Sequence, residues 1–333
     1  MQSSRVGALF LKCFVLASPF LLIVATYLYF DPAQILRHYT DFNHLYLLNR
    51  DFVSTQTFIN NNPTQHYQSF ILGNSRSGAY LTTDWAPHIH DRQPYHFDAA
   101  GESLSGVYGK IKFLDRQGNS LRNVLIVWDR TLLKYTGNPP GGPLFAKDSR
   151  ASENSWAEFQ TGFLKAYFAD FYFIDFLKQK HTEKSPPASS PDYYFVPISN
   201  DMPMVHREAE IRQDSSGYYI RHLDDFKQKH LLSVTEAAPT IQKQQLAVIQ
   251  GIAEVFRKHH TNYQIIISPL LDKVPLNEAD VQAMQAVFGA DHVHNYSGQN
   301  AITEDYHNYY EASHYRPHIA RQIMREIYSP SVK

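Results

Sequence analysis

The run NVLIVW at residues 123–128 is the sequence feature that most constrains the fold. It contains no polar residue from Val124 to Trp128, and unbroken apolar runs of this kind form strands that are buried on both faces of a parallel sheet. Such a sheet needs helices packed on each face. We therefore expect strands and helices to alternate on either side of this run.

The sequence before and after this run has that alternation. Further strands are predicted at 68–72, 94–98, 262–268 and 292–296. Helices are predicted at 103–117, 240–260, 279–288 and 317–328. We therefore predict an α/β fold with an open, mostly parallel five-stranded sheet and helices on both faces. In such a sheet, ligands bind beyond the carboxyl ends of the strands.

The N-terminal segment 6–30 is long and apolar enough to cross a bilayer, because a helix of this length reaches about 37 Å. Arg5 and Lys12 lie at its start, and the positive-inside rule then places the N-terminus in the cytoplasm and the rest of the chain on the extracytoplasmic side. A cleaved signal peptide is the alternative, although the exit ATYLYFDP has no clear small-x-small cleavage site. We predict a single-pass transmembrane anchor, with the lipid bilayer as a partner.

The predicted organisation is an anchor at 1–30, a stalk at 31–67 and the α/β domain at 68–333. Between about 130 and 238 the alternation stops, and an aromatic-rich helical sequence is followed by the linker KSPPASSPD. We expect this insertion to fold over one edge of the sheet as a cap or substrate wall. An irregular excursion without a functional role is the alternative.

The composition argues against several kinds of function. The 31 basic residues balance 32 acidic ones without an extended charge run, so we expect no binding to nucleic acid. Cys13 is the single cysteine, so neither a disulfide framework nor a cysteine metal site can form. His314 and His318 have a spacing used by zinc ligands, but no acidic partner pattern accompanies them. We expect no metal and no cofactor.

Polar residues follow the predicted strands, so one rim of the sheet should gather them. Ser75 lies in a turn after the first strand, and Glu311 and His314 precede the last helix. A serine hydroxyl becomes a good nucleophile when a histidine removes its proton, and a carboxylate orients that histidine. We expect Ser75, His314 and Glu311 to fill these three roles. Ser77 is the rival nucleophile, further into the predicted helix.

Two further positions are candidates for binding the reacting group. The backbone N–H groups of Ser75 and Gly101 are predicted to donate to an oxyanion, and a glycine lets the backbone approach closely. Arg130 follows the third strand and is a candidate for binding an anionic group. A structural ion pair between Arg130 and Asp129, or another neighbour, is the alternative.

These residues resemble the SGNH (GDSL-like) hydrolases, which have a nucleophilic serine in a G-D-S turn, an oxyanion glycine after the second strand and a D-x-x-H pair before the last helix. The matching positions are 73–75, Gly101 and the pair Glu311 and His314, and the resemblance places Asn74 among the oxyanion or substrate-binding residues. The order of anchor, GNSRS, AAGES and SHYRP is similar to a membrane-anchored branch. That branch includes the D-alanyl transfer protein of teichoic acid synthesis and the alginate O-acetylation proteins, which implies partnership with a membrane-bound O-acyltransferase.

Two functional hypotheses follow. The first is an extracytoplasmic O-acyltransferase or acyl esterase that acts on a cell-surface or exported polysaccharide through a Ser75 acyl-enzyme. The second is a non-catalytic protein that binds glycan or serves as a scaffold for a membrane-bound O-acyltransferase. Departures from the family pattern favour the second hypothesis: Asn74 and Glu311 stand where the family has aspartate, and residues 128–130 (WDR) stand where it has glycine-x-asparagine.

Overall fold

A five-stranded, entirely parallel sheet forms the centre of the computed structural model, which describes residues 2–43, 45–169, 172–182, 194–227 and 236–329. The strand order is β2-β1-β3-β4-β5. The strands are β1 (Ser69–Gly73), β2 (Tyr95–His96), β3 (Asn123–Trp128), β4 (Asn262–Ile267) and β5 (Val293–Asn295). All five strands expected from the sequence are therefore present. The predicted linker at 184–192 lies outside the described residues.

Strand β3 lies in the middle of the sheet, between β1 and β4, and all six of its residues are buried. Its side chains alternate between two apolar cores, because successive residues of a strand point to opposite faces. Ile126 and Trp128 belong to the core on one face, and Leu125 and Val127 belong to the core on the other. The unbroken apolar run at 123–128 is thus explained by burial on both sides.

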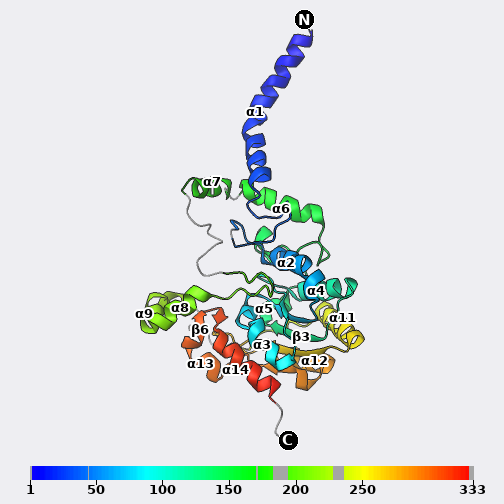
Figure 1. Cartoon of the computed structure of the whole chain (residues 1–333), viewed down its shortest axis with the longest axis vertical. Coiled ribbons are helices and arrows are strands. Elements are labelled where there is room, and N and C mark those ends of the chain that lie inside the picture. Colours follow the sequence, from blue (N-terminus) through cyan, green and yellow to red (C-terminus); the bar gives the residue numbers. More distant parts are fainter. Residues whose placement is uncertain (1, 44, 170–171, 183–193, 228–235, 330–333) are drawn as a thin grey trace.

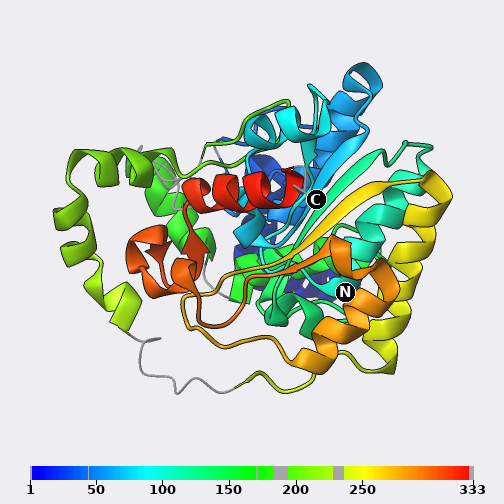
Figure 2. The ribbon, with the colours of Figure 1, turned by 90° about the horizontal axis from the view of Figure 1, so that it is seen from below.

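Helices cover both faces of the sheet, as predicted (Figure 1). The core that contains Ile126 is completed by α4 (Leu104–Arg116), α11 (Lys243–His259) and α12 (Glu278–Phe288). The core that contains Leu125 is completed by α3 (Thr82–Ile89) and α14 (Pro317–Tyr328). Figure 2 shows α11 and α14 on opposite sides of the sheet.

The remaining elements connect or cover this framework. The other α-helices are α1 (Gln2–Phe30), α2 (Arg50–Gln65), α5 (Arg130–Lys134), α6 (Trp156–Ala169), α7 (Tyr172–Thr182), α8 (Val205–Gln213), α9 (Ser215–Arg221), α10 (Leu223–Lys227) and α13 (Ala301–Glu304). Short 3-10 helices are η1 (Ser75–Ala79), η2 (Gly142–Phe145), η3 (Ala290–His292) and η4 (Tyr306–Asn308). Strands β6 (Tyr309–Glu311) and β7 (His314–Tyr315) form a separate antiparallel hairpin.

Helix α1 contains the one helical segment of the described chain that is long and apolar enough to cross a membrane, Val6–Phe30. Its first part projects away from the rest of the molecule (Figure 1). Pro19 lies inside the helix. The helix therefore agrees with the predicted anchor in length and composition.

Residues 31–67 differ from the predicted stalk, because α2 is an integral part of the domain. Phe58 of α2 is buried in the same core as β1 and β3. Arg50, at the start of α2, is 1% exposed and forms an ion pair with Asp98, which follows β2. The stalk interpretation was wrong because six of the nine buried positions of α2 carry polar side chains, a pattern that resembles a solvated segment.

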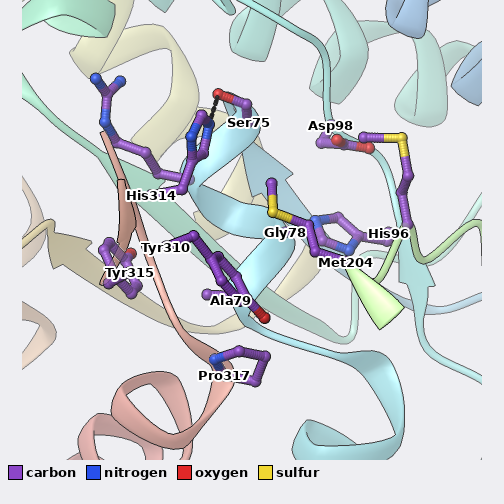
Figure 3. A pocket seen from close by; sticks show the side chains of 12 residues that line it. Ser75, Gly78, Ala79, His96, Asp98, Met204, Tyr310, His314, Tyr315 and Pro317 are labelled. Carbon is purple, nitrogen blue, oxygen red and sulfur yellow. Dashed lines mark hydrogen bonds between the residues drawn. The ribbon is translucent and has the colours of Figure 1, made fainter. Parts of the chain in front are cut away.

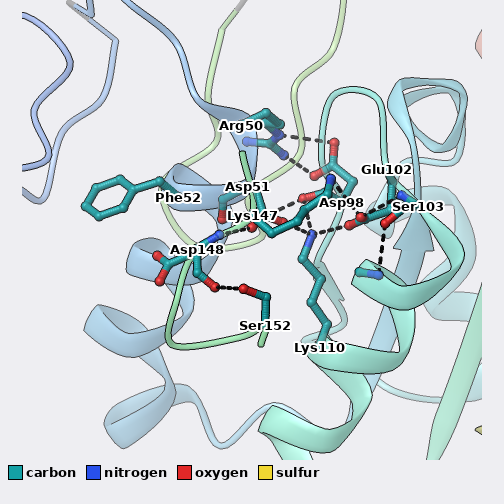
Figure 4. A network of polar contacts seen from close by, with 12 residues as sticks. Arg50, Asp51, Phe52, Asp98, Glu102, Ser103, Lys110, Lys147, Asp148 and Ser152 are labelled. Carbon is teal, nitrogen blue, oxygen red and sulfur yellow. Dashed lines mark hydrogen bonds and ion pairs between the residues drawn. The ribbon is translucent and has the colours of Figure 1, made fainter. Parts of the chain in front are cut away.

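A buried network of charges fastens α2 to the segment that follows β2 (Figure 4). The Lys110 ammonium contacts Asp51 of α2 at 2.7 Å and Glu102 at 2.8 Å, and Lys147 contacts Glu102 at 2.8 Å. Burial raises the pKa of the Glu102 carboxyl, but the two lysines more than offset this and bring its pKa down to about 2. Removing one partner from such a network leaves an unpaired buried charge, which costs about 3–5 kcal/mol.

The insertion at 130–238 separates into two parts instead of covering a single edge. Helices α6 and α7 pack against the C-terminal half of α1 and against residues 33–53. Helices α8 and α9 lie beside the β6–β7 hairpin, where the Tyr218 hydroxyl donates to the carbonyl of Tyr310 at 2.8 Å. Residues 194–204 contact both regions: Phe195 packs in the same cluster as α6 and α7, and the carbonyl of Ser199 accepts from the N–H of His96 in β2 at 2.9 Å. This second part reaches the carboxyl end of the sheet, as does α5, which directly follows β3.

Candidate active site

Ser75, His314 and Glu311 form a continuous hydrogen-bonded chain at the carboxyl end of β1, and Figure 3 shows its hydrogen bond between Ser75 and His314. The Ser75 hydroxyl lies 2.8 Å from Nε2 of His314, although 239 positions separate the two residues in the chain. Nδ1 of the same ring forms a short contact with a carboxylate oxygen of Glu311. The structure therefore brings together the three residues that the sequence suggested for nucleophile, base and orienting carboxylate.

The turn that carries Ser75 is shaped by the close approach of β1 to β3. Gly73 ends β1 at φ 155°, and a Cβ atom there would lie 2.6 Å from the carbonyl oxygen of Val127. The side chain of Asn74 then caps η1 by accepting from the N–H of Arg76 at 3.1 Å. Ser75 is the first residue of η1, where N–H groups have no partner within the helix. This position suits a nucleophile that also supplies an oxyanion donor.

The β6–β7 hairpin places Glu311 and His314 opposite each other. The N–H of Ser313 donates to the second oxygen of Glu311 at 2.8 Å, which holds the carboxylate in the turn. Arg316 follows the hairpin and binds Glu208 of α8 through two hydrogen bonds of 2.9 and 3.0 Å. The imidazole is thus positioned by its own hairpin and by helix α8.

The electrostatics keep Glu311 ionised. Burial raises the pKa of its carboxyl, but the hydrogen bonds that it accepts from His314 and from the N–H of Ser313 outweigh this, so the pKa lies below its ordinary value. An ionised carboxylate can only accept hydrogen bonds, so Nδ1 of His314 carries the proton of that contact. Nε2 is then free to accept the proton of Ser75.

A small cavity of about 40 Å³ opens beside the Ser75 hydroxyl. Met202 and Met204 of the insertion line one side, and Tyr310 and Pro317 of the C-terminal segment line another. Methionine and tyrosine give the cavity a mainly apolar lining. The insertion therefore contributes a wall to the pocket, which agrees with one of the two roles expected for it.

The other three predicted site residues are placed differently. The amide of Asn74 donates to the buried carboxylate of Asp129, so this amide stabilises the turn and is not free to donate to a substrate. Gly101 does not line the cavity; its φ of +55° and its close approach to the Phe145 ring account for the glycine. Arg130 forms an ion pair with Asp272 and lines a different surface pocket, which favours the structural alternative for this residue.

Three acidic or basic side chains in the cavity wall were not among the predicted site residues: Arg76, His96 and Asp98. Arg76 binds Asp129 through one terminal nitrogen at 2.9 Å, while its Nε is buried and has no hydrogen-bond partner in the described part of the chain. The place of Arg76 directly after Ser75 was a usable sequence signal. His96 and Asp98 gave none, because their partners Asp201 and Arg50 are distant in sequence.

A second set of serine, histidine and aspartate lies next to the first. The Ser77 hydroxyl is 2.9 Å from Nε2 of His96, and Nδ1 of His96 is 3.1 Å from Asp201. Ser77 is fully buried, and its hydroxyl also donates to the carbonyl of Asn74 at 2.7 Å. Asp201 in turn accepts from the Thr82 hydroxyl and N–H. This second set thus ties the turn after β1 to the insertion.

The described residues contain no group of three or more histidine, cysteine, aspartate or glutamate side chains that could hold a metal ion. The chain matches no family model and no curated protein. The interpretation of the site therefore depends on its own geometry.

Proposed function

We propose that this protein is a membrane-anchored O-acyltransferase or acyl esterase that acts through a Ser75 acyl-enzyme on a cell-surface or exported polysaccharide. The observation that carries the proposal is the hydrogen bond of 2.8 Å between Ser75 and His314, with Glu311 on the other ring nitrogen. The resemblance to SGNH hydrolases supports the same roles. The small, mainly apolar cavity beside Ser75 favours a short acyl group such as acetyl.

The proposed reaction has two halves. In the first, the Ser75 oxygen attacks the carbonyl carbon of an acyl ester while Nε2 of His314 takes the hydroxyl proton. The ester C–O bond then breaks, and the leaving alkoxide takes that proton from His314. In the second half, a sugar hydroxyl or water attacks the acyl-serine and gives its proton to His314, which returns it to Ser75. Transfer and hydrolysis differ only in this second nucleophile.

Two donors are available for the negative charge that develops on the carbonyl oxygen. One is the N–H of Ser75 itself, at the start of η1. The other is Nε of Arg76, which is buried at the pocket wall and has no partner among the described residues. We propose that Arg76 supplies the donation that Asn74 and Gly101 do not. Preorganised donors of this kind contribute about 3–4 kcal/mol each to transition-state stabilisation.

The anchor supports transfer over hydrolysis. Segment Val6–Phe30 would hold the domain beside a membrane-bound acyl donor, such as a membrane-bound O-acyltransferase carrying an activated acyl group. We place the N-terminus in the cytoplasm and the domain on the extracytoplasmic side, because Arg5 and Lys12 lie at the start of the apolar segment.

The first test is covalent labelling of the full chain with a fluorophosphonate, which reacts with activated serines. The unaltered protein should be labelled once, and Ser75→Ala should not be labelled. Ser77→Ala is the matched control, because it removes a hydroxyl two residues away and should keep the label. Labelling that persists in Ser75→Ala, or that is absent from the unaltered protein, would refute the Ser75 acyl-enzyme.

A second test separates transfer from hydrolysis. The full chain is incubated with an acetyl ester whose acetyl group is isotopically labelled, with and without a soluble polysaccharide. Transfer predicts that the label appears on the glycan and that release of free acetate falls. Release of acetate that is unaffected by glycan would instead identify an esterase.

One observation favours a second candidate function, a non-catalytic glycan-binding or scaffold protein. The Asn74 amide is bound to Asp129 and Gly101 lies away from the cavity, so two family-like oxyanion donors are unavailable in this arrangement. Under this hypothesis the unaltered protein would not react with a fluorophosphonate but would bind glycan. Ser75→Ala would then bind glycan as well as the unaltered protein does.

A further inference from the structure

Helices α6 and α7 make aromatic contacts with the lower half of α1. Phe168 of α6 stacks on Phe20 at 4.7 Å between ring centroids, and Tyr167 lies 5.3 Å from Tyr27. Phe176 of α7 packs edge-on against Phe30. In Figure 1 the two helices run across the base of α1, at a large angle to it. The contacts therefore fix the height of α6 and α7 along the apolar helix.

That height can be compared with the thickness of a bilayer. A hydrocarbon core needs about 20 helical residues, and the apolar segment Val6–Phe30 has 25. Every placement of 20 consecutive residues within this segment includes Phe20 and at least the five residues after it. The residues from Val6 to Pro19 alone would span only about 21 Å. The ring of Phe168, which stacks on Phe20, therefore lies at the level of the hydrocarbon in any of these placements.

The outer surface of α6 and α7 has the composition of a helix pair at a membrane interface. Trp156 is 68% exposed, and Ile174 and Leu177 are 37% and 40% exposed. Lys165 and Lys178 are also exposed on the same two helices. Tryptophan and lysine are characteristic of the headgroup region, where the ring or the alkyl chain is apolar and the polar end remains hydrated.

We propose that α6 and α7 lie in the outer interface of the same bilayer that α1 crosses, with Ile174 and Leu177 facing lipid. This inference rests on the proposed anchoring of α1 and goes beyond it. Continuity with α1 identifies lipid as the occupant of this surface, because a protein partner would have to displace lipid that already surrounds Phe20. The domain would then be held at a fixed height and tilt, and would not swing on a flexible tether.

Because Cys13 is the single cysteine of the chain, a fluorophore can be attached at one chosen position at a time. The full chain with Cys13→Ser provides a background for Ile174→Cys and Leu177→Cys, each labelled with an environment-sensitive fluorophore. Ile220→Cys is the matched control, because Ile220 is an isoleucine on α9 that is 73% exposed and belongs to the part of the insertion beside the β6–β7 hairpin. The unaltered Cys13 is labelled separately and reports whether α1 is inserted.

The proteins are reconstituted alone in vesicles of phosphatidylcholine and phosphatidylglycerol that contain a lipid-borne quencher. We expect blue-shifted emission and loss of intensity for labels at positions 13, 174 and 177, and neither change at position 220. Circular dichroism melting of each variant, compared with the unaltered protein, shows that the substitutions leave the fold intact.

Each other outcome overturns the proposal in a recognisable way. Labels at 174 and 177 that are quenched by aqueous iodide, with position 13 still quenched from lipid, would leave the anchor in place and refute the interfacial placement of α6 and α7. Labels shielded from both quenchers would indicate contact with a second copy of the chain. A label at position 13 that reports water would refute the anchor itself.

Discussion

The turn after β1 carries two serines, two residues apart, and each faces a histidine that contacts a carboxylate. Ser75 contacts His314 at 2.8 Å, and Ser77 contacts His96 at 2.9 Å. The two sets differ in burial. The side chain of His314 is 24% exposed, whereas Ser77 and His96 are at most 1% exposed, although His96 also borders the cavity beside Ser75.

The two sets also differ in where the hydroxyl proton points. Ser77 donates its one proton to the carbonyl of Asn74, so it offers only lone pairs to His96. The Ser75 hydroxyl has His314 as its partner in the described structure. The same three residue types therefore occur once as an accessible set and once as a buried structural clasp, and access and proton direction distinguish the two.

The largest expected effect is on the labelling rate, for a substitution in the set of Ser75, His314 and Glu311. Replacing His314 with alanine should lower the rate of fluorophosphonate labelling at Ser75 by about 10⁶-fold, because the loss of the base disables the whole triad. The free energy of unfolding should change little, since the ring is partly exposed. Labelling reactions quenched at a series of times measure the labelling rate, and urea titrations measure the free energy of unfolding. A rate that falls less than tenfold would mean that Ser75 is not activated by His314.

The next effect tests the orienting carboxylate. Glu311→Gln keeps the size of the side chain but removes its charge, so the ring of His314 loses its preferred tautomer and the stabilisation of its protonated form. The labelling rate should fall by up to about 10⁴-fold. Equal rates for Glu311→Gln and the unaltered protein would show that Glu311 only packs beside the ring.

A substitution in the buried set of Ser77 and His96 should change stability and leave labelling nearly unchanged. Ser77→Ala should keep the labelling rate at Ser75 within a few-fold, but it should lower the free energy of unfolding by about 1–3 kcal/mol, because it leaves the buried Nε2 of His96 without its hydrogen-bond partner. Chemical denaturation followed by tryptophan fluorescence gives the stability. Loss of labelling in a folded Ser77→Ala protein would break the comparison, since it would make Ser77 part of the reaction.

The smallest effect concerns the ion pair that holds the hairpin of His314. Burial raises the pKa of Glu208, but its hydrogen bonds to Arg316 more than offset this, so the pKa lies below its ordinary value. A lowered pKa gives stability that is fully present above the unfolded value, about 4.3, and is lost as pH falls through the folded value. Glu208→Gln should therefore cost about 1 kcal/mol at neutral pH.

Thermal melts of Glu208→Gln and the unaltered protein at several pH values test this dependence. The difference in melting temperature should stay constant from neutral pH down to about pH 5 and then shrink, because protonation of Glu208 removes the ion pair in the unaltered protein as well. A difference that grows on acidification would have the wrong sign for a depressed pKa.

The sequence predicted the sheet and the proximity of Ser75 and His314 for physical reasons. Residues 123–128 form β3 because an apolar run without polar breaks has few alternatives to double-sided burial. Parallel strands end at one edge, so residues after the strands, such as Ser75, could be placed near each other without knowing any distance. Helix α14 begins at Pro317, as expected for a proline in the first turn of a helix.

The parts that were missed depend on partners that are remote in sequence. Arg50 and Lys110 are buried because they meet Asp98 and Asp51, and no local pattern in α2 or α4 indicates these pairs. The set of Ser77 and His96 was missed for the same reason, since His96 contacts Asp201 in the insertion. In the sequence alone, a segment with charged residues resembles a solvated surface, because the positions of the buried counter-charges are not known.

The distance along the chain between Ser75 and His314 has a consequence for biosynthesis. The serine belongs to the first strand-and-turn unit of the sheet and the histidine to the last segment before the final helix. A growing chain therefore holds an unactivated hydroxyl until its last segment has been made and docked. Prematurely terminated products would be inert toward esters, so the enzyme we propose needs no separate inhibitor to remain silent during its own synthesis.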